Sequence, residues 1–114
     1  MPIYVCKLVG RGTVASFTAA LHEATVGPEP RYLMVDTLEM TAYDGEVRSW
    51  FIDEWAKKYP IRAIGGVSEK MLWRMVGFAV GMAVGVPTNI FLRSEEAHHW
   101  LEKLIERDRS RVAR

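Results

Sequence analysis

The chain has 114 residues, of which 49% are hydrophobic and 25% are charged, as in an ordinary globular domain. Its formal net charge of +1 creates no overall field that would draw it to nucleic acid or to an acidic membrane surface. The single cysteine, Cys6, excludes a disulfide within the chain, and the N-terminus has no basic segment followed by an apolar core of the kind found in signal peptides. We therefore expect a cytoplasmic protein with no nucleic-acid partner.

The first predicted unit is a strand followed by a helix. Residues 3–9 are rich in β-branched side chains, which favours a strand, and the glycines at 10 and 12 should break it. Thr13 should then cap a helix whose apolar residues recur at helical spacing as far as Ala24. The segment 27–30, with two prolines, should end that helix because proline cannot continue it.

The second unit begins with four large apolar residues in a row, at positions 32–35. Such a run predicts a strand buried on both faces, which we place at residues 32–37. A loop over residues 38–46 should follow, and Asp44 should cap a second helix that ends before Pro60. The apolar face of that helix is expected to hold Val47, Trp50, Phe51, Trp55 and Tyr59, with Arg48 on its wet side.

The third unit combines a short strand at residues 61–67 with a helix over 68–86 that is apolar nearly all round. Ser68 should cap this helix, and Trp73 near its start belongs either to the core or to an exposed apolar patch. Gly77, Gly81 and Gly85 recur every four residues, which favours close packing on the domain's own sheet over a dimer seam or a lipid contact. The longest apolar run is only twelve residues, whereas a membrane span needs about twenty.

The last unit is a strand at 88–92 and a helix that starts at Ser94. Its inward residues should be Ala97, Trp100, Leu101, Leu104 and Ile105. The arginine-rich residues 107–114 offer no core position, so we expect a frayed tail after a single domain at 1–106. The β-α-β-α-β-α-β-α order predicts an α/β fold with a four-stranded, mainly parallel sheet and helices on both faces. The doubly wound strand order 2-1-3-4 is the most economical arrangement, and it would bring residues 10–12 beside 65–68.

Three segments resemble one known family. They are the strand Val5-Cys6-Lys7-Leu8-Val9-Gly10, the residues Asp36 and Asp44 eight positions apart, and a closing segment at 91–101. That last segment contains Glu95-Glu96-Ala97 and Trp100-Leu101. In this order and spacing the chain resembles the STAS domains, the anti-sigma-factor antagonist fold. It is most similar to the sporulation-antagonist-like branch of small bacterial proteins. The resemblance spans roughly residues 3–105.

The resemblance implies a non-enzymatic domain that binds other proteins, or sometimes small ligands, through the loop before its second helix. Regulatory members of the family carry a switch serine in that loop, and the matching position here is Glu46. We therefore expect no control by serine phosphorylation there. The loop combines apolar and charged side chains, so its predicted partner-binding residues are Met40, Tyr43, Asp44 and Glu46.

The sequence offers little catalytic chemistry. His98 and His99 are adjacent and point about 100° apart on a helix, so they cannot share one face, and no metal-ligand spacing includes them or His22. Cys6 in a central strand is expected to be a buried structural thiol. We assign no catalytic residue, no metal and no cofactor. Gly65, Gly66 and Ser68 before the third helix form a candidate anion site, although a tight turn explains the glycines more simply.

The third helix is the other candidate surface. A helix that is apolar all round must be covered, and the sheet can cover only one side of it. Leu72, Phe78 and Met82 are therefore predicted to form a homodimer or ligand surface. Two functions stay open: a regulatory or protein-interaction module that forms a homodimer, and a carrier with an apolar cavity near this helix for a small molecule or lipid. An enzyme has the weakest support, because no nucleophile–base pair can be assembled.

Overall fold

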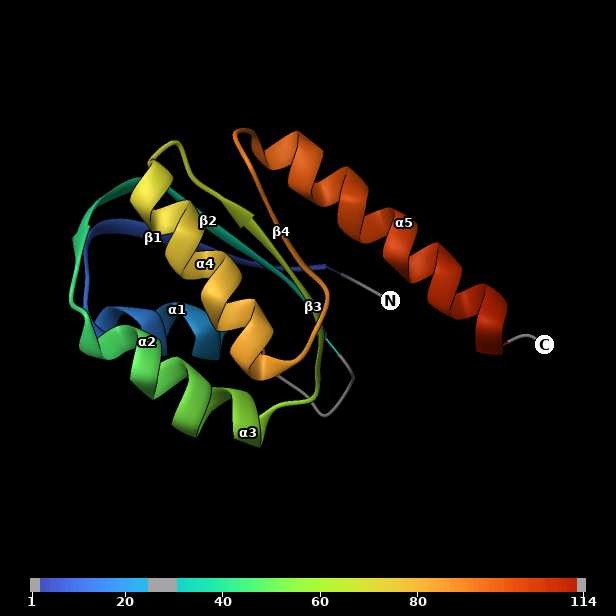
Figure 1. Ribbon diagram of the computed structural model, residues 1–114, viewed down its shortest axis with the longest axis horizontal. Helices are drawn as coiled ribbons and strands as arrows, with labels where there is room; N and C mark the ends of the chain where they lie inside the picture. Colours follow the sequence, from blue (N-terminus) through green and yellow to red (C-terminus); the bar gives the residue numbers. More distant parts are fainter. Residues whose placement is uncertain (1–2, 25–30, 113–114) are drawn as a thin grey trace.

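Figure 1 presents a computed structural model that describes residues 3–24 and 31–112. Four strands form one parallel sheet: β1 (Ile3–Gly12), β2 (Arg31–Tyr43), β3 (Ile61–Val67) and β4 (Thr88–Phe91). The helical elements are α1 (Val14–Ala24), α2 (Glu46–Trp50), the π-helix η1 (Phe51–Trp55), α3 (Ala56–Lys58), α4 (Met71–Val84) and α5 (Ser94–Val112). The predicted α/β alternation, the parallel sheet and the presence of helices on both faces are confirmed.

The strand order is β1-β2-β3-β4, so the predicted order 2-1-3-4 is wrong. Each crossover moves one strand further in the same direction, and right-handed crossovers of that kind put all connecting helices on one face. The α5 helix alone covers the opposite face (Figure 1). Alternate residues of β1 explain why it is an edge strand: Val5, Lys7 and Val9 are exposed on the α5 side, and an interior strand would bury them. Residues 10–12 and 65–68 therefore lie on either side of β2 and not side by side.

The sheet separates two cores. The larger core lies between the sheet and the crossover helices, and it contains Cys6, Leu8, Leu21, Leu33, Met40, Phe51, Trp55 and Ile64. The smaller core lies beneath α5 and contains Tyr32, Met34, Ala63, Val67, Ala97, Leu101, Leu104 and Ile105. Neighbouring residues of β2 thus enter opposite cores, as the continuous apolar run predicts for a strand buried on both faces.

The first two strands are longer than the sequence predicts. They pair with each other beyond the end of β3, as far as Gly12 opposite Tyr43. The register shifts twice on the way, and Gly10 adopts a left-handed conformation with φ of 76° between the two shifts, which glycine tolerates readily. Residues 38–43, predicted as a loop, are therefore the second half of β2, because they satisfy their backbone groups against β1.

One of the three predicted helix caps is confirmed. Thr13 Oγ1 accepts the Ser16 N–H at 3.0 Å, and Ser16 Oγ accepts the Thr13 N–H at 2.8 Å, which closes the first turn of α1. Asp44 does not cap α2: Gly45 precedes that helix without a side-chain bond, and the Asp44 carboxylate instead accepts a bond from Arg11 Nε at 2.9 Å. Ser68 does not cap α4, which begins at Met71; the Ser68 hydroxyl accepts the Lys70 N–H at 3.2 Å within the preceding turn.

The glycines of α4 allow close packing on the sheet. A Cβ added to Gly81 would lie 2.0 Å from Thr88 Oγ1, and one added to Gly77 would lie 2.3 Å from Ile90 Cδ1. Gly85 ends the helix in the left-handed region with φ of 82°, and its N–H donates to the Gly81 carbonyl at 2.9 Å. The preferred interpretation of this repeat, packing against the domain's own sheet, is confirmed for Gly77 and Gly81, whereas Gly85 has open space around it and ends the helix.

The C-terminal helix continues past the predicted domain end at residue 106. It is helical through Val112, and the Tyr32 hydroxyl donates a bond to Asp108 at 2.5 Å. The prediction of a tail depended on the absence of apolar residues after 106. A hydrogen bond between two polar groups cannot be predicted from the spacing of apolar residues. The predicted end of the first helix at 27–30 lies outside the described residues.

Candidate functional site

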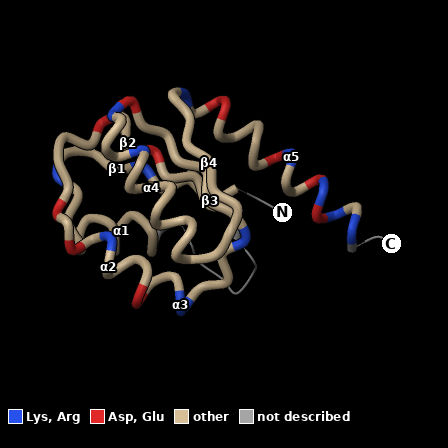
Figure 2. Tube along the Cα trace, in the orientation of Figure 1, with Lys and Arg blue, Asp and Glu red and all other residues tan. Residues whose placement is uncertain are grey.

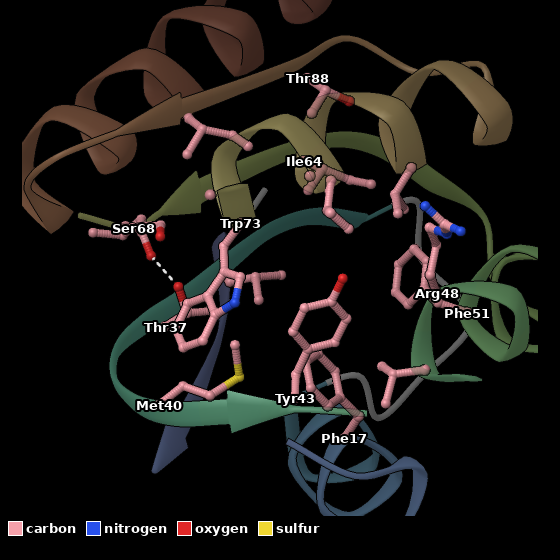
Figure 3. A pocket seen from close by; sticks show the side chains of 18 residues that line it. Phe17, Thr37, Met40, Tyr43, Arg48, Phe51, Ile64, Ser68, Trp73 and Thr88 are labelled. Carbon is pink, nitrogen blue, oxygen red and sulfur yellow. Dashed lines mark hydrogen bonds between the residues drawn. The ribbon is translucent and has the colours of Figure 1, made fainter. Parts of the chain in front are cut away.

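A cavity of about 140 Å³ lies on the crossover-helix side of the sheet, between the second half of β2, β3, β4, α4 and the α2–η1 segment (Figure 3). Most of its wall is apolar. The lining residues are Phe17, Val35, Thr37, Met40, Tyr43, Val47, Arg48, Phe51, Ile64, Gly66, Val67, Ser68, Trp73, Val76, Gly77, Val80, Thr88 and Ile90. A concave, mainly apolar site with a few polar groups is the usual form of a small-molecule site.

The hydroxyl groups of the wall fall into two kinds. The Thr37 hydroxyl donates to the Val67 carbonyl at 2.6 Å, and the Thr88 hydroxyl donates to the Val86 carbonyl at 3.0 Å. Ser68 is tied into the turn before α4. By contrast, the Tyr43 hydroxyl makes no hydrogen bond to any described residue, and in Figure 3 it points into the middle of the cavity.

Arg48 is the only charged side chain among the lining residues. Its guanidinium makes no hydrogen bond or ion pair with any residue in the ranges 3–24 and 31–112, and its side chain is exposed. In Figure 3 it lies beside Phe51 at the rim. The rim of the cavity thus presents a cation that no described residue neutralises.

Aromatic rings hold the cavity open from two sides. Tyr43 meets Trp73 edge to face, with ring centroids 6.1 Å apart and planes at 86°. Lys70 Nζ lies 4.1 Å from the centre of the Trp73 ring. On the other side Phe51 stacks on Trp55 at 5.0 Å, where the helix widens into the π-helix η1. A π-helical turn within an α-helix is often found at functional sites.

The predicted partner-binding residues do not form one surface. Met40 is 6% exposed and belongs to the core and the cavity wall, so it is not the exposed anchor we expected. Tyr43 is half-buried and also lines the cavity. Asp44 is bound to Arg11, and Glu46 is exposed. Met40 and Tyr43 lie on the extended part of β2 and line the cavity, whereas Asp44 and Glu46 follow the end of that strand.

Two further lining residues, Arg48 and Trp73, lie where the spacing of apolar residues in their helices does not place them. Arg48 was assigned to the wet side of its helix, yet it contributes to the cavity rim; the signal is that it lies three residues before Phe51, on the same helix face. Trp73, which we expected in either the core or an exposed patch, is half-buried and forms part of the cavity wall.

The candidate anion site lacks the geometry we expected. Gly65 and Gly66 pair with residues of both β2 and β4, so they lie inside the sheet and not at a helix start. A Cβ on Gly65 would lie 3.0 Å from Leu101, and one on Gly66 would lie 3.1 Å from Ile90. The Ser68 N–H donates to the Phe91 carbonyl at 3.0 Å. These glycines serve close packing on both faces of β3.

The predicted α4 surface is exposed. Leu72 is 66% exposed and Met82 is 83% exposed, with Phe78 between them at 39%. Met71 and Met75 extend the same surface. Figure 2 shows that charges alternate along α5 while α4 is nearly free of them. We call Met71, Leu72, Met75, Phe78 and Met82 the α4 stripe.

The remaining titratable side chains do not gather into a metal site. His98 Nδ1 lies 2.7 Å from a Glu102 oxygen on the surface of α5. Cys6 is 1% exposed, and burial raises the pKa of its thiol to about 12, so it is the structural thiol we predicted. Within the described part of the chain, no group of three histidine, cysteine, aspartate or glutamate residues could hold a metal ion.

No helix among the described residues combines the length and apolar character that crossing a membrane requires.

A parallel sheet in the order β1-β2-β3-β4, with its crossover helices on one face and a long last helix on the other, is a SpoIIAA-like fold, the fold of the STAS domains. A solved structure with this fold is an uncharacterized protein of the DUF3478 family from Shewanella loihica PV-4. It aligns with a TM-score of 0.64 and 17% sequence identity over 85% of this chain and 82% of that one. The predicted resemblance is confirmed at the level of the fold. No model of a known protein family matches the chain, and no curated protein does.

Proposed function

We propose that this domain is a non-enzymatic module that binds another protein through the α4 stripe, and that a second copy of the chain is its first partner. The observation that carries the proposal is the exposure of five large apolar side chains on one helix. Monomeric proteins rarely expose a continuous apolar surface of this kind unless it binds something.

The spacing of the stripe supports helix-on-helix packing. Met71, Met75, Phe78 and Met82 follow one another at intervals of four, three and four residues, which places them along one side of α4. This is the spacing of residues that interlock between two helices in a coiled coil. Arg74 is the only charged residue of α4, so two copies of the helix meet little ionic repulsion. A two-fold axis would let each stripe cover the other.

The test is the oligomeric state at micromolar concentration, measured by sedimentation velocity. We expect the wild-type chain to sediment as a dimer and a Met75→Lys/Met82→Lys variant to sediment as a monomer with an unchanged melting temperature. Val9→Lys is the matched control, because Val9 is 67% exposed but lies on β1, on the other face of the sheet. A wild-type chain that stays monomeric would contradict self-association.

The proposal includes the absence of a phosphorylation switch at the family's usual position. Glu46 occupies that position, is exposed and has a fixed carboxylate that a kinase cannot modify. The bacterial and cytoplasmic setting follows from the resemblance and the lone cysteine, and it stays a prediction. The buried, poorly acidic thiol of Cys6 supports the non-enzymatic reading, because a nucleophilic cysteine needs an exposed thiolate.

A second candidate function is that of a carrier for a small apolar molecule. The cavity next to α4 favours it, since a cavity of about 140 Å³ is close in size to one that holds benzene in another protein, about 150 Å³. Native mass spectrometry of protein purified from cells is the discriminating experiment. A carrier should retain a ligand, whereas an interaction module should be empty.

A further inference from the structure

The cavity is lined by two polar groups that have no hydrogen-bond partner in the described part of the chain. The Tyr43 hydroxyl and the Arg48 guanidinium both line it, and neither makes a hydrogen bond to any residue that the structure describes. The other hydroxyls of the wall are bonded to backbone groups. Arg48 is exposed to water at the rim and Tyr43 is half-buried, so both groups are accessible to a ligand. The few polar groups of a mainly apolar site usually orient the ligand.

Both groups can donate hydrogen bonds, and one is cationic. A guanidinium carries five N–H donors and no acceptor, and its planar shape matches a carboxylate with two parallel bonds. No aspartate or glutamate is among the lining residues. The nearby Asp44 carboxylate is held by Arg11, so it does not compete for Arg48. The charge of the site therefore favours an anion.

The rest of the wall limits what that anion can be. Phe51, Ile64, Val76 and Val80 provide apolar surface, and the volume suits an apolar body of about benzene's size. A strongly hydrated anion such as phosphate would lose hydrogen bonds to water and find no replacement among these apolar side chains. A carboxylate at the rim keeps polar partners while its apolar tail enters the cavity. The two features together describe an amphipathic monoanion.

We propose, resting on the carrier function, that the cavity binds a small monocarboxylate with an aromatic or short alkyl body. The apolar body lies against Val76, Val80 and Ile64, beneath α4. The carboxylate lies on the inner side of the rim, where Arg48 pairs with it from the rim and the Tyr43 hydroxyl donates a hydrogen bond from the middle of the cavity. Arg48 and Tyr43 select for the charge, and the apolar wall selects for the body.

The experiment uses three probes with the same alkyl body: hexanoate, 1-hexanol and hexylamine. Their binding to the full chain is measured by isothermal titration calorimetry and by ligand-observed NMR up to about 10 mM, which covers the weak affinities expected of so small a ligand. We expect hexanoate to bind at least tenfold more tightly than hexanol, and hexylamine to bind most weakly, because a charge-assisted hydrogen bond adds roughly a factor of ten or more.

Three variants locate the site. Arg48→Gln should weaken hexanoate binding about tenfold or more and leave hexanol binding within about twofold. Tyr43→Phe keeps the ring against Trp73 and should weaken hexanoate binding by a smaller factor. Arg62→Gln is the matched control, since Arg62 is exposed on β3 and does not line the cavity, and it should change nothing.

A fourth variant tests the cavity itself. Val76→Phe fills part of the cavity, so it should weaken hexanoate and hexanol binding alike. The added ring occupies existing space, so the melting temperature should not fall. If hexanoate and hexanol bind equally and Arg48→Gln changes neither, the charge selection is overturned while the carrier function stands. If no probe binds and native mass spectrometry finds the protein empty, the carrier function fails and the present inference fails with it.

Discussion

The Tyr32 hydroxyl donates a hydrogen bond to the Asp108 carboxylate, and these two oxygens, 76 positions apart in the sequence, are separated by 2.5 Å. Tyr32 is 1% exposed in the second strand, and Asp108 lies near the far end of α5. The bond therefore fixes the distal part of the longest helix to the centre of the sheet. It also lets a large aromatic ring be buried without leaving its hydroxyl unpaired.

The Tyr32–Asp108 bond should contribute measurably to stability. Asp108→Ala leaves the buried hydroxyl without its acceptor, so we expect the free energy of unfolding to fall by about 1–3 kcal/mol. Tyr32→Phe removes both the donor and its need for a partner, so it should cost about 1 kcal/mol. Urea unfolding of both single variants and the double variant gives the coupling between them. Glu106→Ala, exposed on the same helix, is the control, and equal losses from it and from Asp108→Ala would contradict the bond's role.

Two buried groups should make the fold sensitive to alkaline pH. Burial raises the pKa of the Cys6 thiol to about 12, and burial together with the bond to Asp108 raises the pKa of Tyr32 to about 12. Both groups lose their protons more readily in the unfolded chain, where their ordinary pKa values are 9.0 and 10.0. Stability from these groups is therefore complete below about pH 9 and is lost as the pH rises towards 12.

Chemical denaturation between pH 7 and pH 11 measures this loss. Tyr32→Phe and Cys6→Ala each remove one titrating group, so each variant should lose less stability over that interval than the wild-type chain loses. The same burial predicts that a thiol reagent labels Cys6 only after unfolding. Rapid labelling of the folded protein, or an unchanged alkaline slope in both variants, would show that these groups do not set the pH dependence.

The interior position of β2 predicts a sharp contrast between two leucines of the same strand. Leu33 is fully buried between residues of β1 and β3, whereas Leu38 is 41% exposed. Leu33→Asp buries an unpaired charge, which costs several kcal/mol, on the order of the whole stability of a domain, so the variant should not fold. Leu38→Asp should fold and melt cooperatively. Circular dichroism melts separate these outcomes, and a cooperative melt of Leu33→Asp would overturn the placement of β2.

The contact of α4 with β4 predicts that Gly81 tolerates no side chain. A Cβ there would meet the Thr88 Cβ at 2.4 Å, and Thr88 is β-branched and cannot turn away freely. We expect Gly81→Ala to lower the free energy of unfolding by about 1–3 kcal/mol through overpacking, despite the better helix propensity of alanine. Gly45 has an ordinary φ of −59° and open space around it, so Gly45→Ala is the control and should be nearly neutral. Similar stabilities for the two variants would mean that α4 shifts easily on the sheet.

Local signals in the sequence were sufficient for most of the secondary structure. The third strand was predicted at residues 61–67 and is found there, and Thr13 caps the first helix as expected. The run at Tyr32–Val35 gave a strand buried on both faces, which the two cores on either side of the sheet confirm. The exposure of Leu72, Phe78 and Met82 also followed from the sequence, because a helix apolar all round cannot bury every side against one sheet.

The tertiary structure decided how these elements meet. The order of the strands depends on which strand can expose one face to solvent. The strand β1 does so at Lys7 and lies at the edge of the sheet, but the weak alternation of residues 3–9 does not predict this. The pairing of β1 with β2 beyond β3 turned an expected loop into a strand and directed Tyr43 into the cavity beside Arg48. The local sequence around Tyr43 or Arg48 does not predict that either residue lines a cavity. The wall is made of strands and helices that are distant in the chain and meet only after the sheet has formed.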